Sequence, residues 1–334
     1  MIRLRVGYLI TGILTGFVLL LSFFATIPDG KLHIVFCDVG QGDGMYIRFP
    51  GGKDMVVDGG PNNAIIQCLS DHMPFWDRNI DIVLLTHPDA DHLTGLLSVL
   101  ERYQVQYVVR SDVEQKTEKY TTFKQLITQK KITEKLVTTG EQITFDLATV
   151  SVVWPSKEQI ALMRPVPRLS LEGGKSVLGA STTGSVNDGS VVFSLSYGMF
   201  DALFMGDADS HVQPNMIRFQ GGLQDRIGGK DGVIEVVKVP HHGSKTGMTD
   251  AFLQTIKNSF KGGGLSKLNV MAGLENSFSD QKPLAVISVG KNSYGHPDPG
   301  IVEKLTSADF QVLRTDKAGD IEVVSDGKTW EVKE

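Results

Sequence analysis

The stretch from Leu84 to Leu96, LLTHPDADHLTGL, places two histidines and two aspartates directly after an apolar run. A largely apolar, β-branched run such as IDIVLLT (80–86) predicts a buried strand that ends in a turn. Polar side chains crowded at the mouth of a buried strand cost free energy unless something satisfies them. Imidazole and carboxylate groups are ligands that suit zinc, manganese or iron. The stretch therefore indicates either half of a metal site or a polar loop in which Asp91 caps the next helix.

Three further predicted strands end in residues of the same kinds. Asp207 follows ALFMG, His241 and His242 follow VVKVP, and His296 follows LAVISVGKNSYG. One histidine or aspartate at a strand end is usually structural. Four strand ends that carry them, holding five of the eight histidines of the chain, favour a shared metal site.

Strands and helices alternate along most of the chain, which predicts an α/β or α+β body whose sheets are covered by helices. Residues 156–186 and 261–282 are rich in Gly and polar residues and are predicted to be loop insertions. The predicted strands lie at 32–39, 45–49, 53–60, 80–86, 106–111, 143–155, 190–198, 202–206, 233–239 and 284–290, with two short strands at the end. The predicted helices lie near 63–72, 93–102, 120–129, 251–260 and 301–310.

Residues 7–27, GYLITGILTGFVLLLSFFATI, carry no charge, and two arginines precede them. A helix of about 20 apolar residues spans a bilayer core of roughly 30 Å. The arginines predict that the short N-terminus stays in the cytoplasm and that the chain after Pro28 lies outside. We therefore expect residues 1–30 to be a transmembrane anchor of an extracytoplasmic domain. Secretion after signal cleavage is the alternative. A signal cleavage site has small residues at two nearby positions, as in A-x-A, and Phe23, two residues before Ala25, fits that pattern poorly.

The formal net charge is −5, which gives no general attraction to nucleic acid. Nucleic acid stays open as a partner only through a local basic patch, and no protein partner is predicted. Cys37 and Cys68 lie among apolar residues, in no zinc-binding pattern. The sequence favours core packing for the two cysteines and leaves a single bridge between them open.

Six motifs, in order along residues 31–330, resemble the metallo-β-lactamase superfamily of hydrolases. They are DVGQGD (38–43), VVDGG (56–60), THPDADH (86–92), FMGD (204–207), KVPHHGS (238–244) and NSYGHP (292–297). More narrowly, they resemble the hydrolase domain of the bacterial competence DNA-uptake channel, and bacterial phosphorylcholine esterases share the general pattern. The resemblance implies an αββα sandwich over residues 31–334. Its loops are expected to hold one or two divalent metal ions, zinc first and manganese as the alternative.

Carried over residue by residue, the resemblance implies two metal positions. The ligands expected are His87 and Asp89 at the first position, Asp91, His92 and His241 at the second, and Asp207 as the carboxylate between them. Asp89 departs from the superfamily, where histidine is common, although the competence-type branch also tends to carry Asp there. The usual third histidine is missing from residues 184–196, where Asn187, Asp188 or Ser190 are the candidate replacements. The first position is therefore expected to be the weaker one, and a single ion at the second is the alternative.

The remaining candidates are expected to orient ligands or to touch substrate. Asp91 could orient or deprotonate the attacking water, and His296 could bind a phosphate oxygen or protonate the leaving group. Around Asp43, the turn GQGDG offers small residues that let backbone N–H groups approach an anion. The residues expected to support the ligands or the substrate are Asp58, His242, Asp43, Asn187 and Ser244.

These observations predict a metal-dependent hydrolase acting on an extracytoplasmic phosphoester, most readily a phosphodiester of nucleic acid or of a phosphocholine type. The bound metal would lower the pKa of a coordinated water and so supply hydroxide at neutral pH. A lactam, lactone or thioester hydrolase on the same fold is the first alternative, because a fold does not determine its substrate. A metal-poor binding module is the second, and the intact set of ligands weighs against it.

Overall fold

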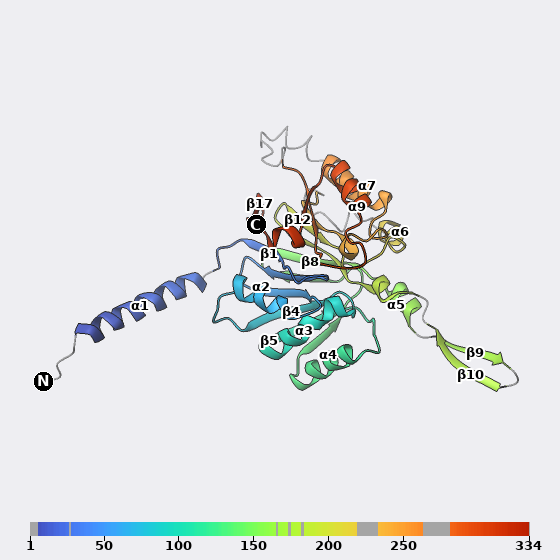
Figure 1. Ribbon diagram of the computed structural model, residues 1–334, viewed down its shortest axis with the longest axis horizontal. Helices are drawn as coiled ribbons and strands as arrows, with labels where there is room; N and C mark the ends of the chain where they lie inside the picture. The colour runs from blue at the N-terminus through green and yellow to red at the C-terminus, as the bar shows by residue number, and fades with distance from the viewer. Residues whose placement is uncertain are drawn as a thin grey trace.

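The computed structural model describes residues 6–26, 28–164, 166–172, 175–181, 184–218, 233–262 and 281–333. Within these residues, two mixed sheets pack face to face and helices cover their outer faces (Figure 1). The arrangement confirms the predicted αββα sandwich of α/β class.

The first sheet has the strand order β17-β16-β1-β2-β3-β4-β5-β6. Its half from β3 to β6 is parallel, and the other half is antiparallel. The strands are β1 (Leu32–Phe36), β2 (Gly44–Arg48), β3 (Asp54–Gly59), β4 (Asn79–Leu85), β5 (Gln104–Arg110), β6 (Thr133–Leu136), β16 (Ile321–Ser325) and β17 (Trp330–Lys333).

The second sheet has the order β15-β14-β13-β12-β11-β8-β7. Here the half from β12 to β15 is parallel and the rest is antiparallel. The strands are β7 (Gln142–Phe145), β8 (Ala148–Trp154), β11 (Val192–Tyr197), β12 (Phe200–Phe204), β13 (Val236–Lys238), β14 (Leu284–Ile287) and β15 (Gln311–Arg314).

Three clusters of buried apolar side chains lie between the layers of the sandwich. One lies between the sheets and includes Phe36, Phe193 and Phe204, whose rings stack on one another. The other two lie between each sheet and its own helices. The first sheet is covered by α2 (Ala64–His72), α3 (Ala90–Arg102) and α4 (Glu118–Gln129); the second is covered by α6 (Gln213–Arg218), α7 (Asp250–Gly262) and α9 (Pro299–Ser307). A short helix, α10 (Thr315–Ala318), precedes β16.

The N-terminal helix α1 (Val6–Thr26) projects away from the sandwich (Figure 1). Its described large side chains, such as Ile13 and Phe17, are exposed. Within the described part of the chain, no helix combines the length and the apolar character that a membrane crossing needs. The prediction of a transmembrane helix over residues 7–27 is therefore not supported by the structure.

The first predicted loop insertion is wrong in its secondary structure. It contains α5 (Lys157–Met163) and a two-stranded antiparallel hairpin of β9 (Val166–Glu172) and β10 (Lys175–Ser181), which projects from the sandwich (Figure 1). The hairpin forms because two seven-residue segments on either side of Gly173-Gly174 pair along their whole length. Most of the second predicted insertion, residues 263–280, lies outside the described residues.

The two cysteines are bridged. A disulfide joins Cys37, directly after β1, to Cys68 on α2, which is the bridge that the sequence left open. Both side chains are also buried in the core, as the sequence predicts. The residues fit an apolar core in either form, and only the packing of α2 against the end of β1 brings the two sulfurs together. The bridge fixes the beginning of the 38–43 segment to the helix that covers the sheet.

Candidate metal centre

The candidate site residues lie at the carboxyl ends of parallel strands from both sheets. Asp58 is the penultimate residue of β3, and His87 follows β4 in the first sheet. Asp207 follows β12, His242 follows β13 and His296 follows β14 in the second sheet. Because neighbouring parallel strands end at one edge of a sheet, the four predicted strand ends meet there as expected.

The backbone at this edge is strained. Asp58, His241 and His242 have φ angles of 55°, 50° and 52°, in the left-handed region that non-glycine residues rarely adopt. Each such residue costs on the order of 1–3 kcal/mol and persists only where the surroundings impose it. Strained residues of this kind are common at functional sites. Here they lie at the ends of two strands, Asp58 in β3 and the two histidines shortly after β13.

His92 is held between two carboxylates. Its Nδ1 lies 2.8 Å from Oδ2 of Asp58. Oδ1 of Asp58 accepts a hydrogen bond from the backbone N–H of Thr86, and Oδ2 accepts one from the hydroxyl of Thr86. Nε2 of His92 lies 3.3 Å from Oδ1 of Asp207. A carboxylate behind one ring nitrogen fixes the orientation of the other, which is how proteins present histidine to a metal. Asp58 therefore lies beneath the site, as the sequence predicts.

His242 has the same construction with a different partner. Its Nδ1 donates to the backbone carbonyl of Ser288 over 3.0 Å. Its Nε2 lies 3.4 Å from Oδ2 of Asp91 and 3.4 Å from Oδ2 of Asp207. The side chain is buried. The structure thus brings Asp91, His92, Asp207 and His242 together around one point.

His241, which the sequence assigns to this position, lies farther out than His242. Its Nδ1 pairs with Oδ1 of Asp209 at 2.9 Å, and its Nε2 is 3.9 Å from Oδ2 of Asp207. A quarter of its side chain is exposed. We therefore place His242 among the inner donors and His241 at their border. The sequence HH cannot distinguish the two, because their directions depend on the strained turn that carries both.

His87 and Asp89 form the other part of the site. Nε2 of His87 lies 3.6 Å from Oδ2 of Asp89, and its Nδ1 faces the hydroxyls of Thr86 at 3.1 Å and Ser190 at 3.3 Å. Asp89 also accepts a hydrogen bond from Gln115. Both residues of the predicted first position are therefore in place and oriented by their neighbours.

The candidate replacements for the missing third histidine have other partners. Ser190 is buried, faces His87 and accepts a hydrogen bond from the backbone N–H of Asp207. Asp188 is paired with His211. Asn187 is buried in the 3₁₀ turn Val186–Gly189, where its backbone N–H bonds to a serine. Ser190 therefore orients His87, and no described replacement completes the first position.

The residues present fit a divalent metal ion. Among the described residues, the buried side-chain atoms without a hydrogen-bond partner include Nε2 of His87, Nε2 of His92, Nε2 of His242 and Oδ1 of Asp207. Donor atoms of His87, His92 and Asp207 all lie within 4.8 Å of one another, and so do those of Asp91, His92 and His242. Buried imidazole nitrogens without partners are costly, and a shared cation would satisfy all of them.

Comparison with known proteins agrees with this geometry. The model of the family described as "Metallo-beta-lactamase superfamily" matches residues 37–258, about two thirds of the chain. The chain belongs to the metallo-β-lactamase superfamily. The fold is therefore that of metal-dependent hydrolases, and the predicted family is confirmed.

Individual relatives are distant. ComE operon protein 3 of Bacillus subtilis (strain 168) is 22% identical over 335 residues, which cover 94% of this chain and 36% of that protein. The chain thus spans about a third of the length of this relative. Among solved structures, the metallo-β-lactamase fold protein YhfI of Bacillus subtilis superposes with a TM-score of 0.50 at 12% identity, over 88% of this chain and 100% of that chain. Zn(2+)-bound PqqB of Methylobacterium extorquens reaches 0.44 at 11% identity, over 84% and 97%.

The electrostatics of this metallo-β-lactamase centre favour a cation. Burial alone would lower the pKa of His92, but the carboxylates of Asp207, Asp58 and Asp43 raise it well above its ordinary value. The pKa of His242 is raised in the same way, chiefly by Asp207 and Asp43 against burial. Burial raises and the two histidines lower the pKa of Asp207, which ends well below its usual value. The carboxylates therefore stay ionised, and they draw positive charge to the imidazoles.

Lys238 is a member of the centre that the sequence analysis missed. It is the last residue of β13 and is fully buried, with Nζ paired to Asp43, 3.2 Å from the carbonyl of Gly206 and 4.0 Å from Oδ1 of Asp207. A buried ammonium is costly unless it is paired, and two carboxylates offset that cost here. The signal in the sequence was a lysine within the largely apolar run VIEVVKVP, three residues before the histidine pair.

Asp43 also differs from its predicted use. Its carboxylate contacts Lys238 and lies 3.2 Å from Nδ1 of His242, so it supports the inner ligands as expected. Its backbone N–H, however, donates to the carbonyl of Asp91 over 3.2 Å. Gly42 is required beside it, since a Cβ there would lie 2.1 Å from that same carbonyl oxygen. The backbone N–H of Asp43 in the turn GQGDG is therefore bonded to the carbonyl of Asp91 and is not available to bind an anion.

The two remaining candidates lie at the border. The ring of His296 is 5.6 Å from that of His241, centre to centre, and its buried Nδ1 has no hydrogen-bond partner among the described residues. Burial, together with the nearby imidazoles of His241 and His242, lowers its pKa. Ser244 faces Thr246, whose hydroxyl bonds to Asp209 behind His241. The structure thus places His296 next to the centre, whereas the side chain of Ser244 is connected to it only through Thr246 and Asp209.

Proposed function

We propose that this superfamily member is a metal-dependent phosphodiesterase. The observation that supports the proposal is the set of donor atoms: three imidazoles and three carboxylates lie together at the carboxyl ends of strands from both sheets. Those residues are His87, His92, His242, Asp89, Asp91 and Asp207. Their unpartnered buried nitrogens fit one or two divalent ions, of which zinc is the first candidate and manganese the second.

A bound divalent ion would lower the pKa of a coordinated water and neutralise charge that develops on a phosphoryl oxygen. The side chains of the chain supply the rest. His92 and His242 would hold the ion from beneath, because Asp58 and the Ser288 carbonyl fix their outer nitrogens. Asp207 lies within reach of both imidazoles and would be shared between the two positions.

Asp91 is the most exposed member of the set. Its side chain is 36% exposed, whereas those of His92 and His242 are almost fully buried. Burial raises its pKa, but the neighbouring imidazoles of His242 and His92 lower it by more, so the pKa ends below its usual value and the carboxylate stays ionised. An ionised carboxylate at the mouth of the centre can orient a water for attack on an incoming ester.

His296 suits contact with the substrate. Its lowered pKa keeps the imidazole neutral near neutral pH, and its Nδ1 has no partner in the described chain. A neutral imidazole can donate one hydrogen bond to a phosphoryl oxygen or accept one proton. Proton donation to the leaving group would first require uptake of a proton, so binding of the phosphoryl oxygen is the role we favour.

Two features support a phosphodiester over a lactam. Asp89 in place of the common histidine makes the first position harder and more anionic, which favours oxygen-rich coordination. The motifs DVGQGD, THPDADH, KVPHHGS and NSYGHP resemble the competence and phosphorylcholine-esterase branches. The net charge of −5 gives no support to nucleic acid as the substrate, and a phosphoester of another kind fits it better.

An extracytoplasmic location belongs to the same proposal. The Cys37–Cys68 disulfide supports it, because such bridges form and persist in oxidising compartments and are rare in the cytosol. Fractionation of cells that express the full chain, followed by protease accessibility of the domain, tests this part. Protection of the domain after the outer barrier has been removed would contradict it.

The activity is tested with a panel of chromogenic phosphodiester, phosphomonoester, lactam and lactone substrates, assayed with zinc and with manganese. We expect hydrolysis of the phosphodiester. His296→Ala should reduce that rate by about 10²–10³, the effect of removing one donor to a developing oxyanion, and leave the metal content unchanged. Tyr294→Phe, in the same loop, is the matched control and should keep the rate. Hydrolysis of the lactam alone, or full phosphodiester turnover by His296→Ala, would contradict the proposal.

A further inference from the structure

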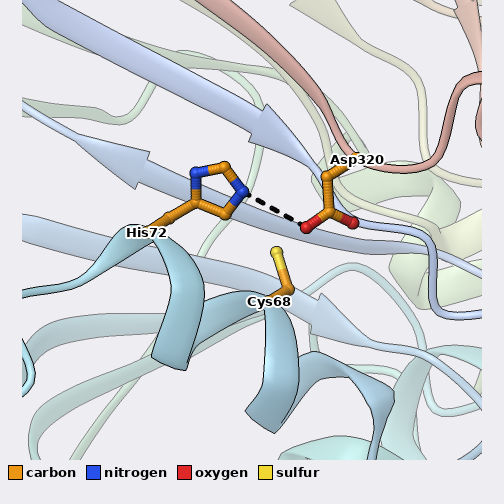
Figure 2. A group of neighbouring side chains, drawn as sticks. All are labelled: Cys68, His72 and Asp320. Atoms are coloured by element: carbon orange, nitrogen blue, oxygen red, sulfur yellow. Dashed lines mark hydrogen bonds and ion pairs between the residues drawn. The ribbon is translucent and has the colours of Figure 1, made fainter. Parts of the chain in front are cut away.

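A second cluster of metal-ligating residue types lies away from the metal centre. Figure 2 shows Cys68 and His72 of α2 pointing toward Asp320, which precedes β16. Nε2 of His72 lies 3.2 Å from Oδ2 of Asp320, and donor atoms of all three residues lie within 4.8 Å of one another. In the structure the sulfur of Cys68 is bonded to that of Cys37.

The cluster is connected to the segment that carries Asp43. Oδ1 of Asp320 accepts a hydrogen bond from the backbone N–H of Asp38 over 2.7 Å. Asp38 follows Cys37, so the disulfide and Asp320 hold the beginning of the same segment. The sulfurs are buried, while the side chains of His72 and Asp320 are about a quarter exposed. Solvent therefore reaches the cluster from the side of the histidine and the aspartate.

We propose that reduction of the Cys37–Cys68 disulfide converts this cluster into a zinc site with Cys37, Cys68, His72 and Asp320 as ligands. A dithiol, which is oxidised to its own disulfide, or a phosphine, which takes the oxygen of a water to become the phosphine oxide, supplies two electrons. The S–S bond breaks, and each sulfur takes one proton, from the dithiol or from that water. Zinc then displaces those protons, since the thiolate is the form that binds metal. While the bridge is intact, neither sulfur is available as a thiolate, and the cluster stays an ion pair beside a disulfide.

The spacing of the ligands suits zinc. Bond lengths of about 2.0–2.1 Å to nitrogen or oxygen and about 2.3 Å to sulfur place tetrahedral ligand atoms roughly 3.3–3.8 Å apart. The 3.2 Å between His72 and Asp320 is close to that separation already. The Cα atoms of Cys37 and Cys68 are 5.8 Å apart, so both sulfurs remain next to the pair once their bond is broken. Two cysteines, one histidine and one carboxylate complete a four-ligand set.

Cobalt(II) titration of the full chain tests the proposal, since cobalt reports thiolate ligands through a sulfur-to-cobalt charge-transfer absorption. The chain has only two cysteines, so cobalt in the catalytic centre cannot produce that band. We expect the band to be absent from the oxidised protein and to appear after reduction by a phosphine. Addition of zinc should then remove it. A reduced protein that keeps its circular dichroism and gives no band would overturn the proposal.

Three variants sharpen the result. His72→Ala should weaken cobalt binding at the reduced site by at least about tenfold. His33→Ala is the matched control, because His33 also pairs with a carboxylate, that of Glu322, but has no cysteine nearby; it should leave the band unchanged. Cys37→Ser frees the Cys68 thiol without a reductant and should give a weaker band, which keeps the test decisive if reduction unfolds the wild type. Equal binding in wild type and His72→Ala, or no band in a folded Cys37→Ser, would overturn the site.

Discussion

The metal centre and the Cys68–His72–Asp320 cluster contain the same kinds of side chain but satisfy them differently. In the centre, His92 and His242 are buried, and one nitrogen of each has no hydrogen-bond partner among the described residues. In the cluster, His72 is partly exposed and its Nε2 is paired with Asp320. The first arrangement leaves buried nitrogens that a cation would satisfy, whereas in the second the imidazole already has a partner. Burial without a partner, more than residue type, therefore distinguishes a prepared metal site from a structural ion pair.

Charge makes the same distinction. The centre gathers Asp43, Asp58, Asp91 and Asp207 around two buried histidines and needs the buried ammonium of Lys238. The cluster has one carboxylate for one imidazole and needs no further charge. An excess of negative charge in a buried place attracts a metal ion. It also lowers the stability of the fold unless the charge is paired, and the following predictions test how the two sites differ in this respect.

The largest effect on stability is expected from Lys238. Lys238→Met removes the partner of the buried Asp43 carboxylate, and breaking a buried ion pair costs about 3–5 kcal/mol. Lys53→Met is the matched control, because Lys53 pairs with Asp81 at the surface, where such a pair contributes about 0–1 kcal/mol. Urea unfolding of both variants measures the difference. Equal losses of unfolding free energy would show that the Asp43–Lys238 pair is not desolvated as the structure has it.

A smaller effect is expected from the carboxylates that orient histidine. Asp58→Asn should weaken binding of the catalytic metal by about 10–100-fold, since it removes the anion behind Nδ1 of His92. Asp320→Asn makes the same change behind His72 and should not alter the catalytic metal content of the oxidised protein. Zinc competition with a chromogenic chelator measures both. A loss of catalytic metal in Asp320→Asn equal to that in Asp58→Asn would erase the distinction between the two clusters.

The smallest effect concerns pH. The hydrogen bond to Asp320 raises the pKa of His72 above its ordinary value of 6.5, against burial. A raised pKa in the folded state means that the stabilisation is fully present below pH 6.5 and is lost as the pH rises through the folded value. His72→Gln should therefore lose up to about 1 kcal/mol at pH 5 and almost nothing at pH 9. Unfolding free energies at the two pH values test this, and an equal loss at both would contradict it.

Much of the fold could be predicted because the apolar runs were long and regular. The runs 80–86 and 284–290 are almost continuously apolar, so β4 and β14 were expected, and polar residues after them marked the strand ends. β6 and α6 were missed. The side chains of β6 are largely exposed, so it lacks the alternation that marks a strand, and α6 has only six residues. The hairpin of β9 and β10 was hidden by a composition typical of loops.

The residue types of the site could be predicted from the sequence, but the orientations of its side chains could be predicted less well. His87, Asp89, Asp91, His92 and Asp207 all lie where their motifs place them. The choice between His241 and His242 depends on two residues with positive φ and on the Ser288 carbonyl, 46 residues away. The pairing of Lys238 with Asp43 spans 195 residues, and that of Cys37 with Cys68 spans 31. Contacts of this kind arise from tertiary packing, which no local pattern records.

The central claim is that the metal is held by the buried, unpartnered imidazoles, and metal analysis of two neighbouring variants tests it most directly. His242→Ala and His241→Ala are purified in parallel, equilibrated with zinc and assayed for bound metal, with circular dichroism to verify the fold. We predict that His242→Ala loses the metal of the second position. His241→Ala removes an imidazole that lies farther from Asp207 and is a quarter exposed, and it should retain most of that metal. A zinc-free His241→Ala beside a fully loaded His242→Ala would contradict the account.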